Sequence, residues 1–175
     1  MTDAFSRDRL QPALLDRLID DAPGASAEAP EARTLTRQRL RQAVLRDLTW
    51  LLNSMSMLDA DDDDPSLEHV RRSTVNFGFP PLSGAMTSSL EPYEIEQRVR
   101  QSILDFEPRI LPESLQVRAI PPKDRLEQRQ LIELEISGEL WAQPYPLELL
   151  LRTEVHLDSG QVEVCEGAVP VRGAR

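Results

Sequence analysis

The clearest candidate for chemistry in this sequence is a pair of opposite charges around a proline. Glu107 and Arg109 flank Pro108, just after an apolar stretch with helical spacing. Proline fixes its own φ and disfavours helical geometry at the preceding residue, so both charges stand on a stiff corner. They could clamp a partner chain, bond internally and lock the corner to a helix, or form a surface pair of little energetic weight. The residues alone leave these alternatives open.

Two aromatic side chains on one loop pose a similar choice. Phe77 and Phe79 flank Gly78 and precede a pair of prolines, a composition typical of a shaped loop rather than a helix or strand. The two rings could cover the core of their own domain. They could also be an exposed anchor for another chain, because aromatic residues are enriched at interfaces.

An acidic loop raises the possibility of calcium binding. Asp59, Asp61 and Asp63 have the first three ligand spacings of an EF-hand. However, Asp64 stands where that loop needs its turn glycine, and Val70 stands where it needs a bidentate glutamate. We therefore interpret this stretch as a solvated loop without a metal.

Other catalytic classes find little support in the residue inventory. His69 and His156 are the only histidines, and Cys165 is the single cysteine, so no cluster has zinc-ligand spacing. We expect Cys165, on a predicted strand, to be a small buried hydrophobe. Glycoside hydrolysis needs only two well-placed carboxylates and stays open, although no aromatic cluster suggests a sugar cleft. We expect no enzyme activity and no cofactor.

Composition limits the partners and the compartment. The chain has 175 residues, a net charge of −10 and 5% aromatic residues. An acidic chain repels phosphate backbones and anionic membrane surfaces, so we expect neither nucleic-acid binding nor membrane insertion. We find no apolar run of roughly 20 residues and no signal-peptide pattern at the first residues, and we expect a cytoplasmic protein.

An N-terminal arm precedes the predicted domain. Leu14, Leu15 and Leu18 lie on one face of a short amphipathic helix, and a segment rich in alanine and proline follows at residues 22–30. So short a helix is marginal alone in water and must dock on its own domain or on a partner. We assign residues 1–33 to this arm and a flexible linker.

Two long helices are expected next. The first begins near Thr36 and ends at Asn53 or Ser54; its apolar residues at helical spacing are Leu40, Val44, Leu48, Leu51 and Leu52. The second begins near Ser88 or Ser89, where Ser88 and Glu91 have capping-box spacing, and ends at Glu107 before the proline.

The last third of the chain changes from helical to alternating periodicity. Segments 115–119, 132–136 and 147–157 alternate apolar and polar residues, and a hairpin turn at 158–160 leads into a last short strand. This pattern predicts a mostly antiparallel sheet with one solvated face. We therefore predict an α+β domain over residues 34–167, with two helices on a small sheet, and a tail at 168–175. The first and last strands are the expected sheet edges.

Four segments together resemble one protein family, and they lie in the family's order. Residues 10–18 resemble the family's LQPSLLDRL arm, and residues 46–53 resemble its RDLxxLLN helix. Residues 73–84 resemble its S-x-x-N-[YF]-G-[LF]-P-D-x-x-G loop, and residues 107–109 resemble its Glu-Pro-Arg motif. Pro81 and Ala13 depart from the usual Asp and Ser. The sequence thereby resembles TssE, the baseplate wedge subunit of type VI secretion systems, which is related to a contractile phage tail wedge protein once labelled lysozyme-like.

The resemblance implies a structural role. It implies a fold similar to the handshake domain of sheath subunits, and binding to TssF and TssG and to the TssB/TssC sheath. TssK is a further candidate partner, in a baseplate docked at the inner membrane complex. Partner contacts are implied at Glu107, Pro108 and Arg109, and we add Phe77, Phe79, Leu14, Leu15 and Leu18 as candidates. An open sheet edge would accept a sheath strand; the alternative function is a muramidase.

Overall fold

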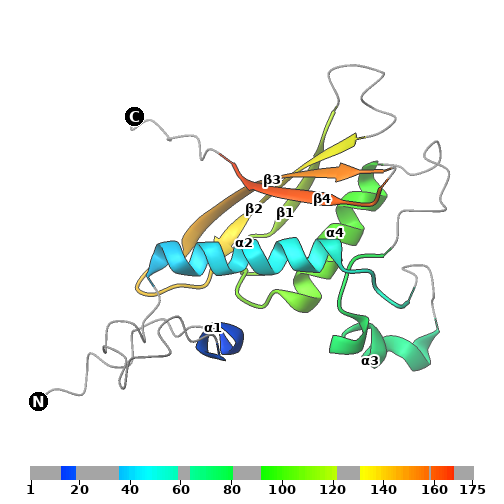
Figure 1. Ribbon diagram of the computed structural model, residues 1–175, viewed down its shortest axis with the longest axis horizontal. Helices are drawn as coiled ribbons and strands as arrows, with labels where there is room; N and C mark the ends of the chain where they lie inside the picture. The colour runs from blue at the N-terminus through cyan, green and yellow to red at the C-terminus, as the bar shows by residue number, and fades with distance from the viewer. Residues whose placement is uncertain are drawn as a thin grey trace, which may run out of the picture.

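The computed structural model describes residues 13–18, 36–58, 64–80, 92–121, 131–157 and 159–167. A four-stranded sheet packs on two long helices, which confirms the predicted α+β class (Figure 1). The helices are α1 (Leu14–Leu18), α2 (Arg37–Asn53), α3 (Glu68–Arg71) and α4 (Pro92–Phe106), with 3₁₀ turns at Pro65–Leu67 and Thr74–Asn76. The strands are β1 (Gln116–Ile120), β2 (Leu131–Leu140), β3 (Leu147–His156) and β4 (Val162–Glu166).

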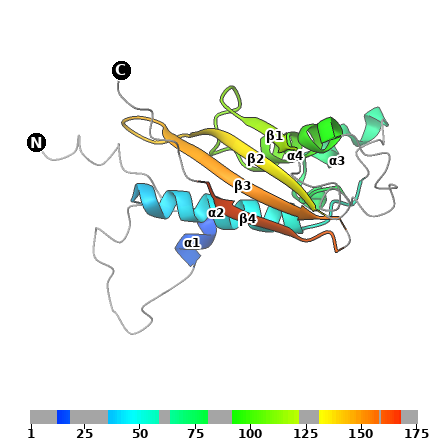
Figure 2. The same ribbon diagram turned by 90° about the horizontal axis from the view of Figure 1, so that it is seen from above.

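The sheet has the simplest possible order, β1-β2-β3-β4, and each neighbouring pair is antiparallel. The predicted edges are therefore confirmed: β1 and β4 each pair with one described strand only. One face of the sheet carries the two helices, with α2 on the β4 side and α4 beside β1 (Figure 2). The opposite face is solvated, as the alternation predicts.

Local sequence explains where the helices begin and end. The hydroxyl of Thr36 accepts a hydrogen bond from the backbone N–H of Arg39 at 3.2 Å, which caps α2. Its end at Asn53 also agrees with the prediction. Helix α4 ends at Phe106, as Pro108 requires, whereas the predicted start at Ser88 lies outside the described residues.

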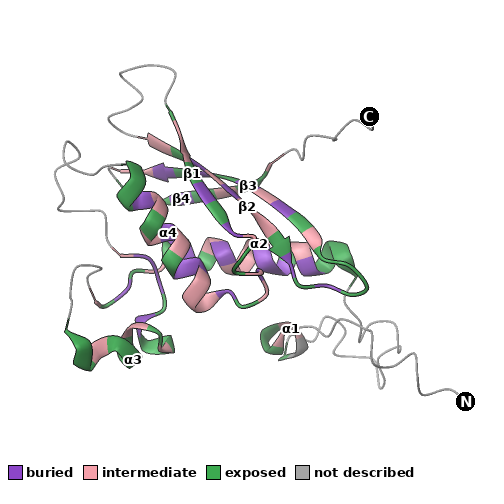
Figure 3. Ribbon diagram, turned by 180° about the vertical axis from the view of Figure 1, so that it is seen from behind, coloured by how far each residue is buried: buried purple, intermediate pink, exposed green. Residues whose placement is uncertain are grey.

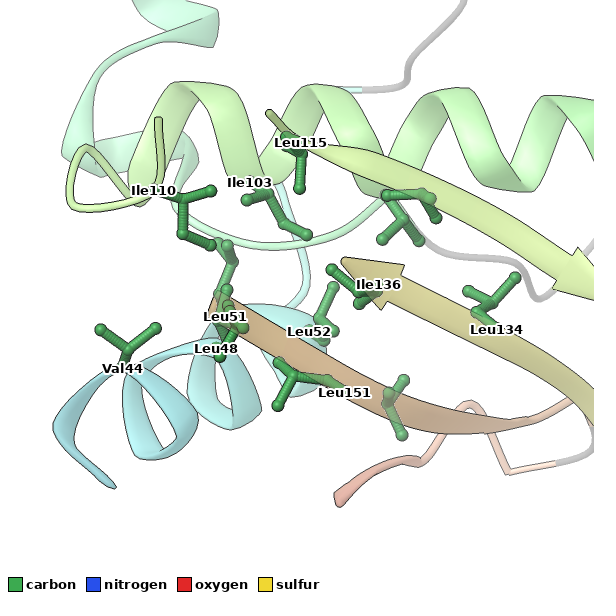
Figure 4. Packing of buried hydrophobic residues seen from close by; sticks show 14 of the residues in the cluster. Val44, Leu48, Leu51, Leu52, Ile103, Ile110, Leu115, Leu134, Ile136 and Leu151 are labelled. Atoms are coloured by element: carbon green, nitrogen blue, oxygen red, sulfur yellow. The ribbon is translucent and has the colours of Figure 1, made fainter. Parts of the chain in front are cut away.

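The core lies between the helices and the inner face of the sheet. It is built almost entirely from aliphatic side chains, as an aromatic-poor sequence requires (Figure 4). The burial pattern is strongest where α2, α4, β2 and β3 face one another, and the outward faces of these elements are exposed (Figure 3). The fully buried large side chains are Val44, Leu48, Leu51, Ile95, Val99, Ile103, Ile110, Leu134, Ile136, Leu140, Leu151 and Val155.

The prediction for Cys165 was wrong. Val162 and Val164 turn toward the core side of β4, so the strand's alternation places Cys165 on the solvated face, where it is exposed. The candidate calcium residues Asp59 and Asp61, with Asp63, lie outside the described residues. Within the described ranges, no group of three His, Cys, Asp or Glu could hold a metal, and no helix is long and apolar enough to cross a bilayer.

A glycine allows two loops to cross after α2. Gly78 has φ +147°, and an added Cβ would lie 2.6 Å from the carbonyl oxygen of Ser54. This close approach lets the backbone N–H of Phe79 donate to that same oxygen at 2.7 Å. Nearby, the buried side chain of Asn76 accepts hydrogen bonds from the backbone N–H groups of Met57 and Leu58. The loop is therefore part of the folded body.

We predict that Gly78→Ala lowers the free energy of unfolding by about 3 kcal/mol or more, because the new methyl group meets backbone atoms at a positive φ. Gly160→Ala is the matched control. Gly160 has φ +70° with no atom within 4 Å of an added Cβ, so we expect a loss of only about 1 kcal/mol. Urea unfolding of both variants measures the difference, and equal losses would contradict the crossing as its cause.

Candidate partner-binding site

The charged corner is a partly buried internal cluster centred on Arg109. Its Nε donates to Oε1 of Glu107 at 2.6 Å, and its Nη2 donates to Oε2 of Glu107 and to Oδ2 of Asp47, the latter at 2.6 Å. Asp47 belongs to α2, whereas Glu107 follows α4. The guanidinium therefore locks the corner to α2, which is the internal alternative left open by the sequence.

Backbone hydrogen bonds hold this corner from both sides. The N–H of Glu107 donates to the carbonyl of Ile103 at 2.8 Å, which continues the hydrogen bonding of α4 by one residue. The N–H of Trp141 donates to the carbonyl of Arg109 at 2.7 Å, and Ile110 bridges Leu140 at the end of β2. The corner therefore joins α2, α4 and the start of the β2–β3 connection.

Burial and charge act in opposite directions on Arg109. Burial alone would lower its pKa, but the hydrogen bonds and negative charges of Glu107 and Asp47 outweigh burial and raise the pKa above its ordinary value. Arg109 therefore stays charged at every physiological pH. The Glu107 side chain is only 4% exposed, whereas Pro108 is exposed and the Arg109 side chain keeps 24% of its surface. A partner can reach the proline and one side of the guanidinium.

An asparagine covers part of the free edge of β4. The Asn53 side chain accepts a hydrogen bond from the backbone N–H of Val162 at 3.0 Å and donates to the carbonyl of the same residue at 2.8 Å. The amide thus takes the place of a neighbouring strand at this position. Farther along β4, the backbone N–H and C=O groups of Val164 and Glu166 point away from β3, as those of Val162 do, because ladder bonds alternate along an antiparallel strand.

A carboxylate caps part of the free edge of β1. The carboxylate of Glu96 on α4 accepts a hydrogen bond from the outward N–H of Ala119 at 2.7 Å. The carbonyl of Ala119 and both backbone groups of Val117 face the same way, and no described residue pairs with them. Each edge of the sheet is thus capped at one position by a side chain from a helix and is open elsewhere in the described part of the chain.

The two candidate phenylalanines have different environments. Phe79 is 6% exposed and belongs to the core cluster, so its assignment as a surface anchor was wrong: its loop passes under the end of α2. Phe77 is 36% exposed and meets Phe106 edge to face, with ring centroids 5.4 Å apart. Phe77 therefore stays a candidate contact residue, and its ring partner Phe106 directly precedes Glu107 in the chain.

Among the described residues, an ion pair joins the arm to α2. Asp16 of α1 bonds Arg46 of α2, while Leu14 and Leu18 are 70% and 73% exposed and Leu15 is 40% exposed. None of the three leucines belongs to the core or packs against it. Their partner-binding role, like that of Glu107, Pro108 and Arg109, stays a prediction.

Sequence reasoning missed three residues of this region. Arg46 and Asp47 entered only as part of the segment 46–53, and Asn53 as a helix end, yet Asp47 bonds both Arg46 and Arg109. The RDLxxLLN pattern was the available signal, because its charged and amide positions do not contribute to the apolar stripe. The pattern could not identify their partners, which come from residues 16, 109 and 162.

We predict that Glu107→Ala lowers the free energy of unfolding by about 3 kcal/mol, because it leaves Arg109 half-buried with Asp47 as its remaining charged partner among the described residues. Glu113, an exposed carboxylate a few residues on, is the matched control, and Glu113→Ala should change stability by less than about 0.5 kcal/mol. Chemical denaturation followed by circular dichroism measures both. Equal stability of the two variants would show that the pair does not hold the corner.

We predict that deleting residues 1–33 lowers the melting temperature by less than about 4 °C, since the partly buried ion pair between the described part of the arm and α2 makes a single hydrogen bond and contributes about 1 kcal/mol. Differential scanning calorimetry of the full and shortened chains provides the test. A drop above about 10 °C would mean that the arm contributes to the core of the domain.

Comparison with known proteins places this architecture in a family. The family model described as Baseplate wedge protein gp25 matches residues 38–145, which is more than half of the chain and runs from α2 to the β2–β3 connection. No curated protein and no solved structure gives a significant match. The chain therefore belongs to the baseplate wedge protein gp25 family.

Proposed function

We propose that this chain is a non-catalytic wedge subunit of a type VI secretion baseplate. In this proposal it binds the wedge proteins TssF and TssG, with TssK as a further neighbour, and it starts polymerisation of the TssB/TssC sheath. The baseplate would lie in the cytoplasm, docked at the inner membrane complex. Family membership supports a structural baseplate role, and the antiparallel sheet with its open edge positions supports the sheath-starting role.

The observation that carries the sheath-starting role is the row of outward backbone groups on β4. Asn53 satisfies Val162, but Val164 and Glu166 have no partner among the described residues for their outward N–H and C=O groups. Such groups can accept an added strand, with backbone bonds supplying affinity and alternate side chains supplying specificity. On β4, two alternate residues, Val164 and Glu166, have both outward backbone groups without a described partner. On β1 this holds for Val117 alone among the described residues, so β4 is the favoured edge.

The Glu107 corner supports wedge binding in a modified form. Because Glu107 is buried and bonded to Arg109, we infer that its carboxylate positions the guanidinium of Arg109 and does not itself contact a partner. Pro108 and the exposed side of Arg109 are the surface that a wedge protein would meet. Both carboxylates of the cluster are engaged by the same arginine, an arrangement that does not favour the muramidase alternative.

We predict that Val164→Pro blocks sheath assembly while the domain stays folded. The N–H of Val164 points away from β3, so proline there removes an edge donor without breaking the sheet. Sheaths per cell, counted by fluorescence microscopy in cells with this variant as the only copy, should fall at least about tenfold if strand addition contributes 1.4 kcal/mol or more.

The matched control is Glu163→Pro. The N–H of Glu163 points toward β3 and bonds Glu154. Proline there removes a bond of the β3–β4 ladder, so we expect a larger loss in the free energy of unfolding than for Val164→Pro. Val117→Pro tests the other edge. Normal sheath numbers with folded Val164→Pro protein would overturn the role of β4, and loss with Val117→Pro alone would assign it to β1.

A further inference from the structure

Arg46 has an unusual set of neighbours on the outer side of α2. Its Nε donates to Asp47 at 2.8 Å, its Nη1 donates to Asp16 of the arm, and its guanidinium carbon lies 5.1 Å from the ring centroid of Trp50. An arginine stacked on an aromatic face presents its free edge in a fixed orientation to a planar carboxylate. Asp47 and Trp50 therefore fix one side of the guanidinium, and Asp16 occupies the other.

The bond between Asp16 and Arg46 is incomplete. Oδ2 of Asp16 and Nη2 of Arg46 are both buried, and neither has a hydrogen-bond partner. An arginine and a carboxylate usually meet through two parallel hydrogen bonds, and each unmet buried group carries a cost. The arm therefore fills this position with one good bond out of two, and a carboxylate that approaches more squarely would bind better.

The surroundings of Arg46 favour an acidic occupant. Helix α2 carries four arginines and one aspartate, a local charge of +3 within a chain of net charge −10. The occupant already present carries its carboxylate between two leucines: Leu14 and Leu18 flank Asp16 on α1 and remain mostly exposed. The site therefore accommodates a carboxylate on a leucine-bearing segment.

We propose that Arg46 and Trp50 form a docking site for a carboxylate of another protein chain, and that Asp16 fills this site until the partner displaces it. The partner segment resembles α1 in chemistry, with an aspartate or glutamate beside leucine-type residues. The exchange releases the arm from α2, so that its exposed leucines can contact the partner. This site is separate from the sheet edges and does not depend on the sheath-starting role.

The test uses the full chain with Trp141→Phe, which leaves Trp50 as the only tryptophan. A synthetic peptide copying residues 10–19 is titrated into this protein carrying Asp16→Asn, and Trp50 fluorescence reports binding. We expect saturable binding that is about tenfold weaker for the same peptide carrying Asp16→Asn, as the loss of a charge-assisted hydrogen bond requires. Restoring Asp16 in the chain should also weaken binding of the original peptide, because the arm then competes.

Arg46→Gln in the protein should remove the difference between the two peptides while its melting curve shows a folded domain. The peptide substitution leaves the protein unchanged, so it keeps the test valid even if that variant is unstable. Equal binding of both peptides would overturn the carboxylate site in favour of purely apolar contact. Absence of binding to the Asp16→Asn protein would also overturn the proposal.

Discussion

The guanidinium of Arg109 is the interaction on which the arrangement of the domain depends. It bonds Glu107 after α4 and Asp47 on α2. The backbone carbonyl of Arg109 also accepts a hydrogen bond from the N–H of Trp141, just after β2. Apolar burial holds the helices against the sheet, but it is non-directional and tolerates sliding of one helix past another. A partly buried cluster of three charged groups with fixed geometry adds the missing direction, and breaking it would leave an unpaired charge.

The same helices that cover the core also protect the edges of the sheet. Asn53 lies at the end of α2 and satisfies Val162, and Glu96 on α4 satisfies Ala119. An unprotected edge invites association with any exposed strand, whereas a fully covered edge could accept none. Partial caps leave short open stretches, which suits a protein proposed to accept one particular strand at one position.

Charge continues from the corner toward the arm through a shared carboxylate. Asp47 bonds Arg109 with one oxygen and Arg46 with the other, and Arg46 in turn bonds Asp16. Two proposed contact regions, the Pro108–Arg109 surface and the Arg46–Trp50 site, therefore share Asp47. A partner that changes the bonding of Arg46 changes the competition for Asp47, so the two regions are physically coupled at this side chain.

The sequence by itself determined the long helices and the strands of this protein, because their signals are local; the short helix α3 was not predicted. Helix α2 follows from its apolar spacing and the Thr36 cap, α4 ends where Pro108 forbids helix, and the strands follow from period-two alternation. The stiff corner at residues 107–109 was also visible, since proline acts on its immediate neighbours. Only the tertiary structure decided which groups meet: Glu107 turns inward to Arg109, Phe79 enters the core, and Asn53 reaches Val162, 109 residues away. These contacts depend on where α2 crosses the sheet, and that crossing is set by the packing of the whole core together with the Arg109 cluster, not by any residue's neighbours in the chain.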